Sequence, residues 1–264
     1  MTIKNVAMKK MFIFSPDNGN DMNGMRILVE CLHRLKNHPE YKQIKPKDAM
    51  NFFAPLLGSL RQLTGEQENG HKMQALQAFG IEGLESIKSF LQESTPRLCL
   101  KGALGIVKNF AMATQFHEIL DKHDFVNQVV QKLFIYWCDE LEFRKNPIHA
   151  MEGVKIVEIL EILIGCLMAF AKQPMFRNRI QNQTIIIMLK KLLTISLPPP
   201  QPPPIQIQKM IITTLFSLTG EPDGSFYKDG TFAVMNFGPC QPIENLINNY
   251  RNAQNNSKEK QICK

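Results

Sequence analysis

The chain of 264 residues contains a single tryptophan, Trp137, and lacks any apolar run of the length that a membrane-spanning helix requires. Its most apolar stretch, residues 156–171, is interrupted by Glu158 and Glu161, which favours a buried helix. The first fourteen residues lack the long apolar core and the small-residue cleavage site of a secretory signal. We therefore expect an intracellular protein, cytoplasmic or cytoskeletal, with a nuclear location also open.

Closely spaced cysteine pairs are missing too. The six cysteines are widely separated and no two of them form a C-x-x-C pair, which disfavours a disulfide framework. Four of them lie within apolar helical patterns, where free cysteine behaves as a small hydrophobic residue: Cys31, Cys99, Cys138 and Cys166.

Known catalytic signatures are not found in the sequence. It has no glycine-rich phosphate loop, no dinucleotide-binding glycine pattern, no nucleophile elbow and no His-Glu-x-x-His motif. His117 and Asp121 share a helix face, but a turn separates them from His123, which disfavours a metal site there. Glu158 and Glu161 lack the partner histidine of a carboxylate metal site. We expect no enzymatic activity, no metal and no cofactor.

Apolar residues recur at helical spacing along most of the chain, and the helices follow a repeated order. A helix, a tight break, a short helix and a long helix are predicted three times: at residues 21–36 with 47–63, at 95–113, 116–122 and 124–143, and at 149–171, 174–180 and 184–195. In the first copy, Pro39 makes the break. Residues 71–79 and 84–91 look like a degenerate unit, and 206–218 predict a further helix.

Two stretches sixty residues apart carry the same apolar pattern. Phe110-Ala111 corresponds to Phe170-Ala171, and Phe116 corresponds to Phe176. A fixed register of this kind favours stacked helical units that share one elongated core over a single closed globule. We therefore predict an all-α fold in which an array of helices presents a long surface to another macromolecule.

The predicted boundaries follow from composition. Residues 1–20 are an N-terminal extension, 21–220 a helical-repeat domain, 221–250 an irregular C-terminal cap and 251–264 a disordered basic tail. The stretch 197–205 contains six prolines and predicts polyproline II. We favour a stiff loop between two helices; the alternative is a ligand for an SH3-type or WW-type partner.

Residues 31–44 and Ile106–Ala111, the latter followed by Phe116 and Ile119, resemble the armadillo-repeat family and, more loosely, HEAT-like repeats. An armadillo unit ends its third helix in a Leu-x-Asn-Leu-Ala-like stretch and then runs through a short first helix into an apolar second helix. The resemblance implies an armadillo-like α-solenoid, a right-handed superhelix of stacked helices. It also implies protein partners bound along a concave groove made by the third helices.

The chain departs from that family in two respects. Armadillo units have about forty residues, whereas the clear copies here lie seventy-five and then sixty residues apart, so surplus helices such as residues 132–143 must fill the difference. Members of the importin-alpha type also carry a ladder of groove tryptophans and asparagines. The asparagine positions here are Arg34, Asn109 and Ala169, and the tryptophan positions are Glu30, Gly105 and Gly165. This argues against binding of nuclear-localisation peptides.

Two functions follow from these observations. The leading interpretation is a non-catalytic protein-binding scaffold or adaptor, a subunit of a larger assembly. The side chains predicted on its binding face are Arg34, Lys101, Lys108, Asn109 and Glu161. The alternative is nucleic-acid binding by a basic concave face, suggested by the net charge of +7. Scattered basic residues and the scarcity of aromatic residues among them disfavour that alternative.

Overall fold

The computed structural model describes residues 24–37, 46–65, 71–143, 151–194 and 205–219. The predicted N-terminal extension, the prolines of the 197–205 stretch, the cap and the basic tail lie outside these residues. Helices make up most of the described part. Extended pairing within it is confined to one isolated antiparallel bridge between Met151 and Val154.

The chain divides into two compact units, Met1–Phe170 and Ala171–Lys264. The first unit contains α2 (Gly24–Asn37), α3 (Pro46–Thr64), α4 (His71–Lys88), α5 (Arg97–Ala111), the 3-10 turn η2 (Thr114–Phe116), α6 (His117–Lys122), the π-helical segment η3 (Phe125–Gln131), α7 (Lys132–Phe143) and α8 (Ile156–Ala171), whose last residue marks the boundary. The second unit contains α9 (Pro174–Ile180), α10 (Gln183–Thr194) and α11 (Ile205–Thr219).

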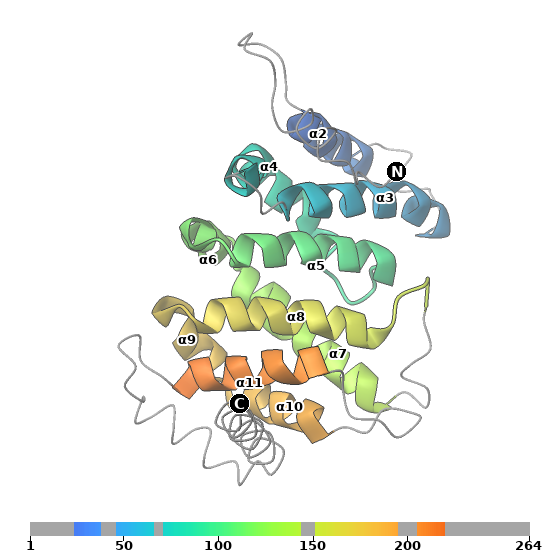
Figure 1. The fold of residues 1–264 in the computed structure, drawn as a ribbon. Coiled ribbons are helices and arrows are strands. Elements are labelled where there is room, and N and C mark those ends of the chain that lie inside the picture. Colours follow the sequence, from blue (N-terminus) through green and yellow to red (C-terminus); the bar gives the residue numbers. More distant parts are fainter. Residues whose placement is uncertain (1–23, 38–45, 66–70, 144–150, 195–204, 220–264) are drawn as a thin grey trace, which may run out of the picture. The chain divides into compact units, whose positions relative to one another are not determined.

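In the first unit, α3, α5 and α8 lie side by side in this order (Figure 1). We call each of these three stacked helices a rung. Helix α5 is buried on most of its sides, including Leu100, Ile106 and Phe110, because it has neighbours on both flanks. Helix α8 is apolar around almost its whole circumference, the composition of a helix that neighbours cover on every side. The first unit therefore contains the stacked helices with a shared core that the sequence predicts.

The closest approach between two rungs is that of α3 and α5. It occurs at Gly102, where an added Cβ would lie 2.8 Å from Leu57 Cβ and 3.3 Å from the Leu57 carbonyl carbon. Glycine is needed here because any larger residue would push the two helix backbones apart. The shared core of the first unit therefore depends on the absence of a side chain at this position.

Four helices, α3, α5, α8 and α11, end in the same kind of residue pair and correspond to the third helices of armadillo units. The last two residues of each helix are a large apolar residue and a small one: Leu63-Thr64 in α3, Phe110-Ala111 in α5, Phe170-Ala171 in α8 and Leu218-Thr219 in α11. Leu63, Phe110, Phe170 and Leu218 are fully buried. These pairs are 47, 60 and 48 residues apart in the sequence, so α3, α5, α8 and α11 are equivalent helices of successive repeats.

A buried polar side chain binds the end of two of these helices in the same way. His117 shares a 2.7 Å hydrogen bond through Nε2 with the carbonyl oxygen of Ala111. Sixty residues further on, Arg177 donates from Nε to the carbonyl oxygen of Ala171 at 3.1 Å. Both side chains are only 3% exposed. Since the last carbonyls of a helix have no partner within the helix, each side chain satisfies one of them and fixes the sharp bend that follows.

The sequence pattern treats residues 21–36 as equivalent to residues 95–113, which makes them the third helix of the first copy, and this assignment is wrong. Helix α2 packs mainly against α4, and it is α3 that lies along α5. The repeat preceding α5 therefore lies 47 residues upstream rather than 75, which is within the range of armadillo and HEAT units. The sequence misled because α2 and α5 are both amphipathic, and amphipathicity does not say which neighbour a helix has.

The surplus stretch 132–143 also has a defined place. It forms α7, which continues from η3 and so lengthens the second helix of its repeat. Trp137 is buried there, with the guanidinium of Arg97 5.3 Å from its ring, and Arg97 also donates to the Val154 carbonyl at 3.2 Å. The 60-residue spacing therefore results from a longer second helix and its connection to α8 rather than from an additional repeat.

Replacement of Gly102 by alanine tests the close approach of α3 and α5. Alanine is the better helix former by about 1 kcal/mol, but its methyl group would overpack against Leu57, at a typical cost of about 1–3 kcal/mol. We expect urea unfolding to show a net loss of stability for Gly102→Ala. Gly58→Ala is the matched control, since nothing lies within 4 Å of its added Cβ, and it should be neutral or slightly stabilising. Equal effects of the two changes would contradict the proposed contact.

Candidate functional site

The equivalent positions of α3, α5 and α8 form one surface of the first unit, which we call the third-helix face. On α5 and its C-cap residue it consists of Leu98, Lys101, Gly105, Lys108, Asn109 and Met112. Leu98 and Met112 are 38% and 47% exposed, and the polar side chains between them are half-buried. A shift of 47 residues leads to the α3 members and a shift of 60 to the α8 members, so the face runs across all three rungs.

Glycine occupies the same position of this face on each rung: Gly58, Gly105 and Gly165. At Gly105 and Gly165, a basic side chain from the preceding rung fills the space of the missing side chain, whereas nothing lies within 4 Å of an added Cβ at Gly58. An added Cβ at Gly105 would lie 2.3 Å from Arg61 Cδ, and one at Gly165 would lie 2.7 Å from Lys108 Cε. The stems of Arg61 and Lys108 therefore lie across the next helix.

Asn109 joins two rungs through its side-chain amide. Its Nδ2 donates to the Arg61 carbonyl oxygen at 3.0 Å and to Thr64 Oγ1 at 2.9 Å. Both acceptors belong to the last turn of α3, and the Arg61 carbonyl also accepts from the backbone N–H of Gly65 at 3.1 Å. The equivalent residue of α3 is Gln62, whose buried Oε1 has no hydrogen-bond partner within the described residues. Asn109 therefore stabilises the stacking of the face that it also helps to form.

Charge alternates across the face between α5 and α8. Lys101 Nζ forms an ion pair with Glu158 Oε2 on α8. Burial would raise the pKa of Glu158, but the hydrogen bond from Lys101, the backbone N–H of Lys155 and the charges of both lysines outweigh burial and lower it. Glu161 stands at the position equivalent to Lys101, sixty residues on. The face therefore carries both signs of charge at equivalent positions.

The sequence-predicted residues divide between this face and another surface. Lys101, Lys108, Asn109 and Glu161 all occupy third-helix positions. Arg34 does not, because α2 is outside the α3–α5–α8 row, and its guanidinium instead pairs with Glu30 at 2.6 Å while remaining 78% exposed. Its expected placement beside the other four is therefore wrong.

Arg61 and Gln62 of α3 were missed in the sequence as members of the face, as were the apolar Leu98 and Met112. The signal for the two α3 residues was present: residues 58–64 read Gly-Ser-Leu-Arg-Gln-Leu-Thr and residues 105–111 read Gly-Ile-Val-Lys-Asn-Phe-Ala. The match lies in the spacing of the glycine, the basic residue, the amide and the final apolar–small pair. The ladder positions of the first copy are consequently Gln62 and Gly58, in place of Arg34 and Glu30.

The histidines considered as metal ligands are engaged in separate contacts. His117 is buried against the Ala111 carbonyl and the Phe170 ring, whereas His123 Nδ1 contacts Glu85 Oε1 at 2.6 Å. Across the described ranges, no group of three or more histidine, cysteine, aspartate or glutamate side chains is arranged to hold a metal ion. The described helices also include none with both the length and the apolar character needed to cross a bilayer.

The described cysteines are free thiols in two different settings. Cys99, Cys138 and Cys166 are buried, as expected of small hydrophobic residues, but Cys31 is exposed. Burial raises the pKa of Cys99 to about 11 and, despite the opposing charge of Lys108, that of Cys166 to about 12. Both thiols therefore remain protonated at neutral pH, the form with little nucleophilic reactivity.

Comparisons with known proteins point to the same architecture. No model of a protein family matches the chain. The Armadillo segment polarity protein of Drosophila melanogaster is 24% identical over 158 residues, which cover 57% of this chain and 19% of that protein. A solved chain from a study of a conserved phosphorylation switch controlling the interaction between cadherin and beta-catenin matches with a TM-score of 0.61 at 18% identity, covering 87% of this chain and 46% of that one.

These matches, together with the equivalent third helices, define the chain as an all-α helical-repeat protein. Within that class its fold is that of the armadillo repeats, in a degenerate form, so the predicted fold class is confirmed. The chain spans less than half of the solved chain that it matches (46%) and about a fifth of the curated relative (19%).

Loss of the Lys101–Glu158 pair should have a pH-dependent effect on stability. Because the pKa of Glu158 is held below its ordinary value of 4.5, the pair stabilises the fold above that pH, and this contribution disappears as the pH falls through the lowered value. With both side chains partly exposed (28% and 35%), the pair is worth at most about 1 kcal/mol. The free energies of unfolding of the wild type and Lys101→Met should differ at neutral pH and converge in acid.

Lys132→Met is the matched control, since Lys132 Nζ lies 3.9 Å from Glu93 Oε1 in a pair whose side chains are 71% and 42% exposed. It should have almost no effect at any pH. A difference between the wild type and Lys101→Met that persists unchanged in acid would contradict the role assigned to the pair.

Proposed function

We propose that the protein is a non-catalytic scaffold or adaptor, which binds a segment of a partner protein along its third-helix face as a subunit of a larger assembly. The observation that carries the proposal is the continuity of this face across α3, α5 and α8. Equivalent positions recur on every rung, and they bring half-buried polar side chains next to the exposed Leu98 and Met112. Such a row offers both hydrogen-bonding groups and apolar area to an elongated ligand.

The polar residues proposed to contact the partner are Lys101, Lys108, Asn109 and Glu161, together with Arg61. The stems of Arg61 and Lys108 are held against Gly105 and Gly165. A side chain that is already immobilised loses less conformational entropy when it binds, which favours a specific contact. The glycines that replace the tryptophans of the importin-alpha type support a partner different from a nuclear-localisation peptide.

A second candidate is the binding of nucleic acid. The net charge of +7 and the row formed by Arg61 and Lys108 favour it, since phosphate groups attract such side chains. Glu158 and Glu161 lie on the same face and oppose it. A gel shift with mixed DNA and RNA at low salt is the test: retardation that falls steeply with added salt supports this candidate, and unchanged mobility eliminates it. A contact of the proline-rich stretch with an SH3-type or WW-type domain stays a prediction outside the described residues.

Reversal of charge at Lys108 tests the leading proposal. The full-length wild type, Lys108→Glu and the control Lys132→Glu are coupled to beads and incubated with native extract. Lys132 is a suitable control because it is 71% exposed and belongs to α7, outside the third-helix face. We expect quantitative mass spectrometry to find partner proteins captured equally by the wild type and Lys132→Glu but depleted about tenfold with Lys108→Glu, a difference of about 1.4 kcal/mol.

Thermal unfolding of the three proteins shows whether the variants are folded. Identical capture by all three would count against the third-helix face. Recovery of each protein alone, sedimenting as a monomer, would count against the scaffold function itself.

A further inference from the structure

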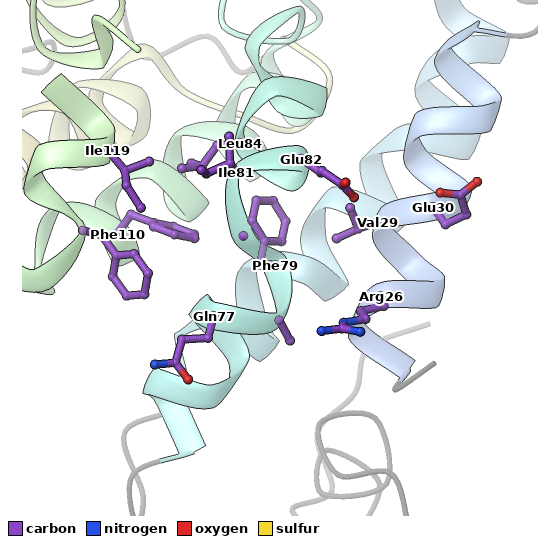
Figure 2. A pocket seen from close by; sticks show the side chains of 13 residues that line it. Arg26, Val29, Glu30, Gln77, Phe79, Ile81, Glu82, Leu84, Phe110 and Ile119 are labelled. Atoms are coloured by element: carbon purple, nitrogen blue, oxygen red, sulfur yellow. The ribbon is translucent and has the colours of Figure 1, made fainter. Parts of the chain in front are cut away.

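A groove of about 680 Å³ lies between α2 and α4 in the first unit, away from the third-helix face (Figure 2). Its floor is apolar and includes Val29 of α2, Phe79 of α4 and Phe110 of α5. A second cavity shares Val29, Glu30, Ile81 and Glu82 with it and continues to His33 and Asn37 near the end of α2. The two form one elongated depression, which we call the α2–α4 groove.

The backbone of Gly80 shapes the mouth of this groove. Its φ of 59° and ψ of −166° interrupt α4, and an added Cβ would meet nothing within 4 Å. Glycine is therefore required for its conformation rather than for space. The interruption is followed directly by Ile81, 48% exposed, and by the exposed Glu82, both of which line the groove. An exposed isoleucine beside an apolar floor is a surface that a ligand can cover.

The side chains that line the groove carry a net negative charge, whereas the chain as a whole is positively charged. Three carboxylates line it, those of Glu30, Glu82 and Glu85, against the guanidinium of Arg26 and the imidazole of His33. Among the described residues, Glu82 takes part in no ion pair. In Figure 2 its side chain points from α4 towards Val29 on α2. The groove therefore carries a local charge opposite in sign to the net charge of +7 of the whole chain.

The other two carboxylates have partners that a ligand could replace. Glu30 pairs with Arg34 at 2.6 Å, where Arg34 is 78% exposed, and Glu85 contacts His123 at 2.6 Å. Exposed pairs of this kind contribute little stability, about 0–1 kcal/mol. An incoming cation can therefore compete for these carboxylates at small cost.

From this complementarity we propose that the α2–α4 groove is a second docking surface, and that it binds a segment of a partner protein in which arginine or lysine stands next to large apolar side chains. The basic group lies between Glu30 and Glu82. The apolar side chain covers Ile81 and reaches the floor formed by Val29 and Phe79. Acidic segments are excluded, because they would place like charges beside three carboxylates. With both surfaces occupied, one chain joins two different proteins.

The test uses a phage-displayed library of random 12-residue peptides, panned on the full-length wild type and counter-selected on Glu82→Lys. We expect enriched peptides with arginine or lysine within a few positions of leucine, isoleucine or an aromatic residue. Fluorescein-labelled copies should bind the wild type and the control Glu93→Lys equally, and Glu82→Lys at least tenfold more weakly. Ile81→Ser should also weaken binding. Glu93 is a matched control because it is an exposed glutamate that does not line the groove.

Three results would overturn the proposal: no enrichment after repeated panning, enrichment of acidic peptides, or an affinity that Glu82→Lys leaves unchanged. Lys108→Glu separates this proposal from that of the third-helix face. Binding that is lost with Lys108→Glu and kept with Glu82→Lys belongs to the third-helix face and contradicts a site in the α2–α4 groove. Thermal unfolding of each variant verifies that it is folded, so that weaker binding reports on the groove.

Discussion

The first unit depends on how closely its third helices approach one another. At Gly102 the distance from α5 to Leu57 of α3 leaves no room for a methyl group. At Gly105 and Gly165 the missing side chains leave space for the stems of Arg61 and Lys108. Close packing of this kind transmits small changes in side-chain volume to the whole stack, because protein interiors contain few voids that could absorb them.

The same constraint links stability to recognition. Arg61, Lys108 and Asn109 each contact the neighbouring rung, and each is also proposed to meet a ligand. Part of each side chain is thus committed to the fold, while its remaining polar groups belong to the surface. A binding face built in this way is already ordered before the ligand arrives, which reduces the entropic cost of association. The α2–α4 groove differs, since its shape comes from a break within one helix at Gly80.

Much of the fold could be predicted from the pattern of residues. The 60-residue register pairs Phe110 with Phe170 and Phe116 with Phe176, and all four are buried. Four of the five predicted face residues occupy third-helix positions because equivalent residues of a repeat have equivalent orientations. The exception, Arg34, follows from the incorrect register of the first copy. The α3 sequence resembles that of α5 mainly in its glycine, basic and amide residues, and an apolar periodicity alone does not detect this.

The sequence by itself determined that the chain is helical, repetitive and without recognised catalytic motifs, since apolar spacing and local signatures depend only on neighbouring residues. Only the tertiary structure decided which helix lies beside which. In the structure α3 packs along α5, and the side chain of Arg61 lies against Gly105. Glu30 of α2 and Glu82 of α4 line the same groove. The physical reason is that an amphipathic helix specifies that one face must be covered, whereas the neighbour that covers it is selected by the shape and volume of both surfaces.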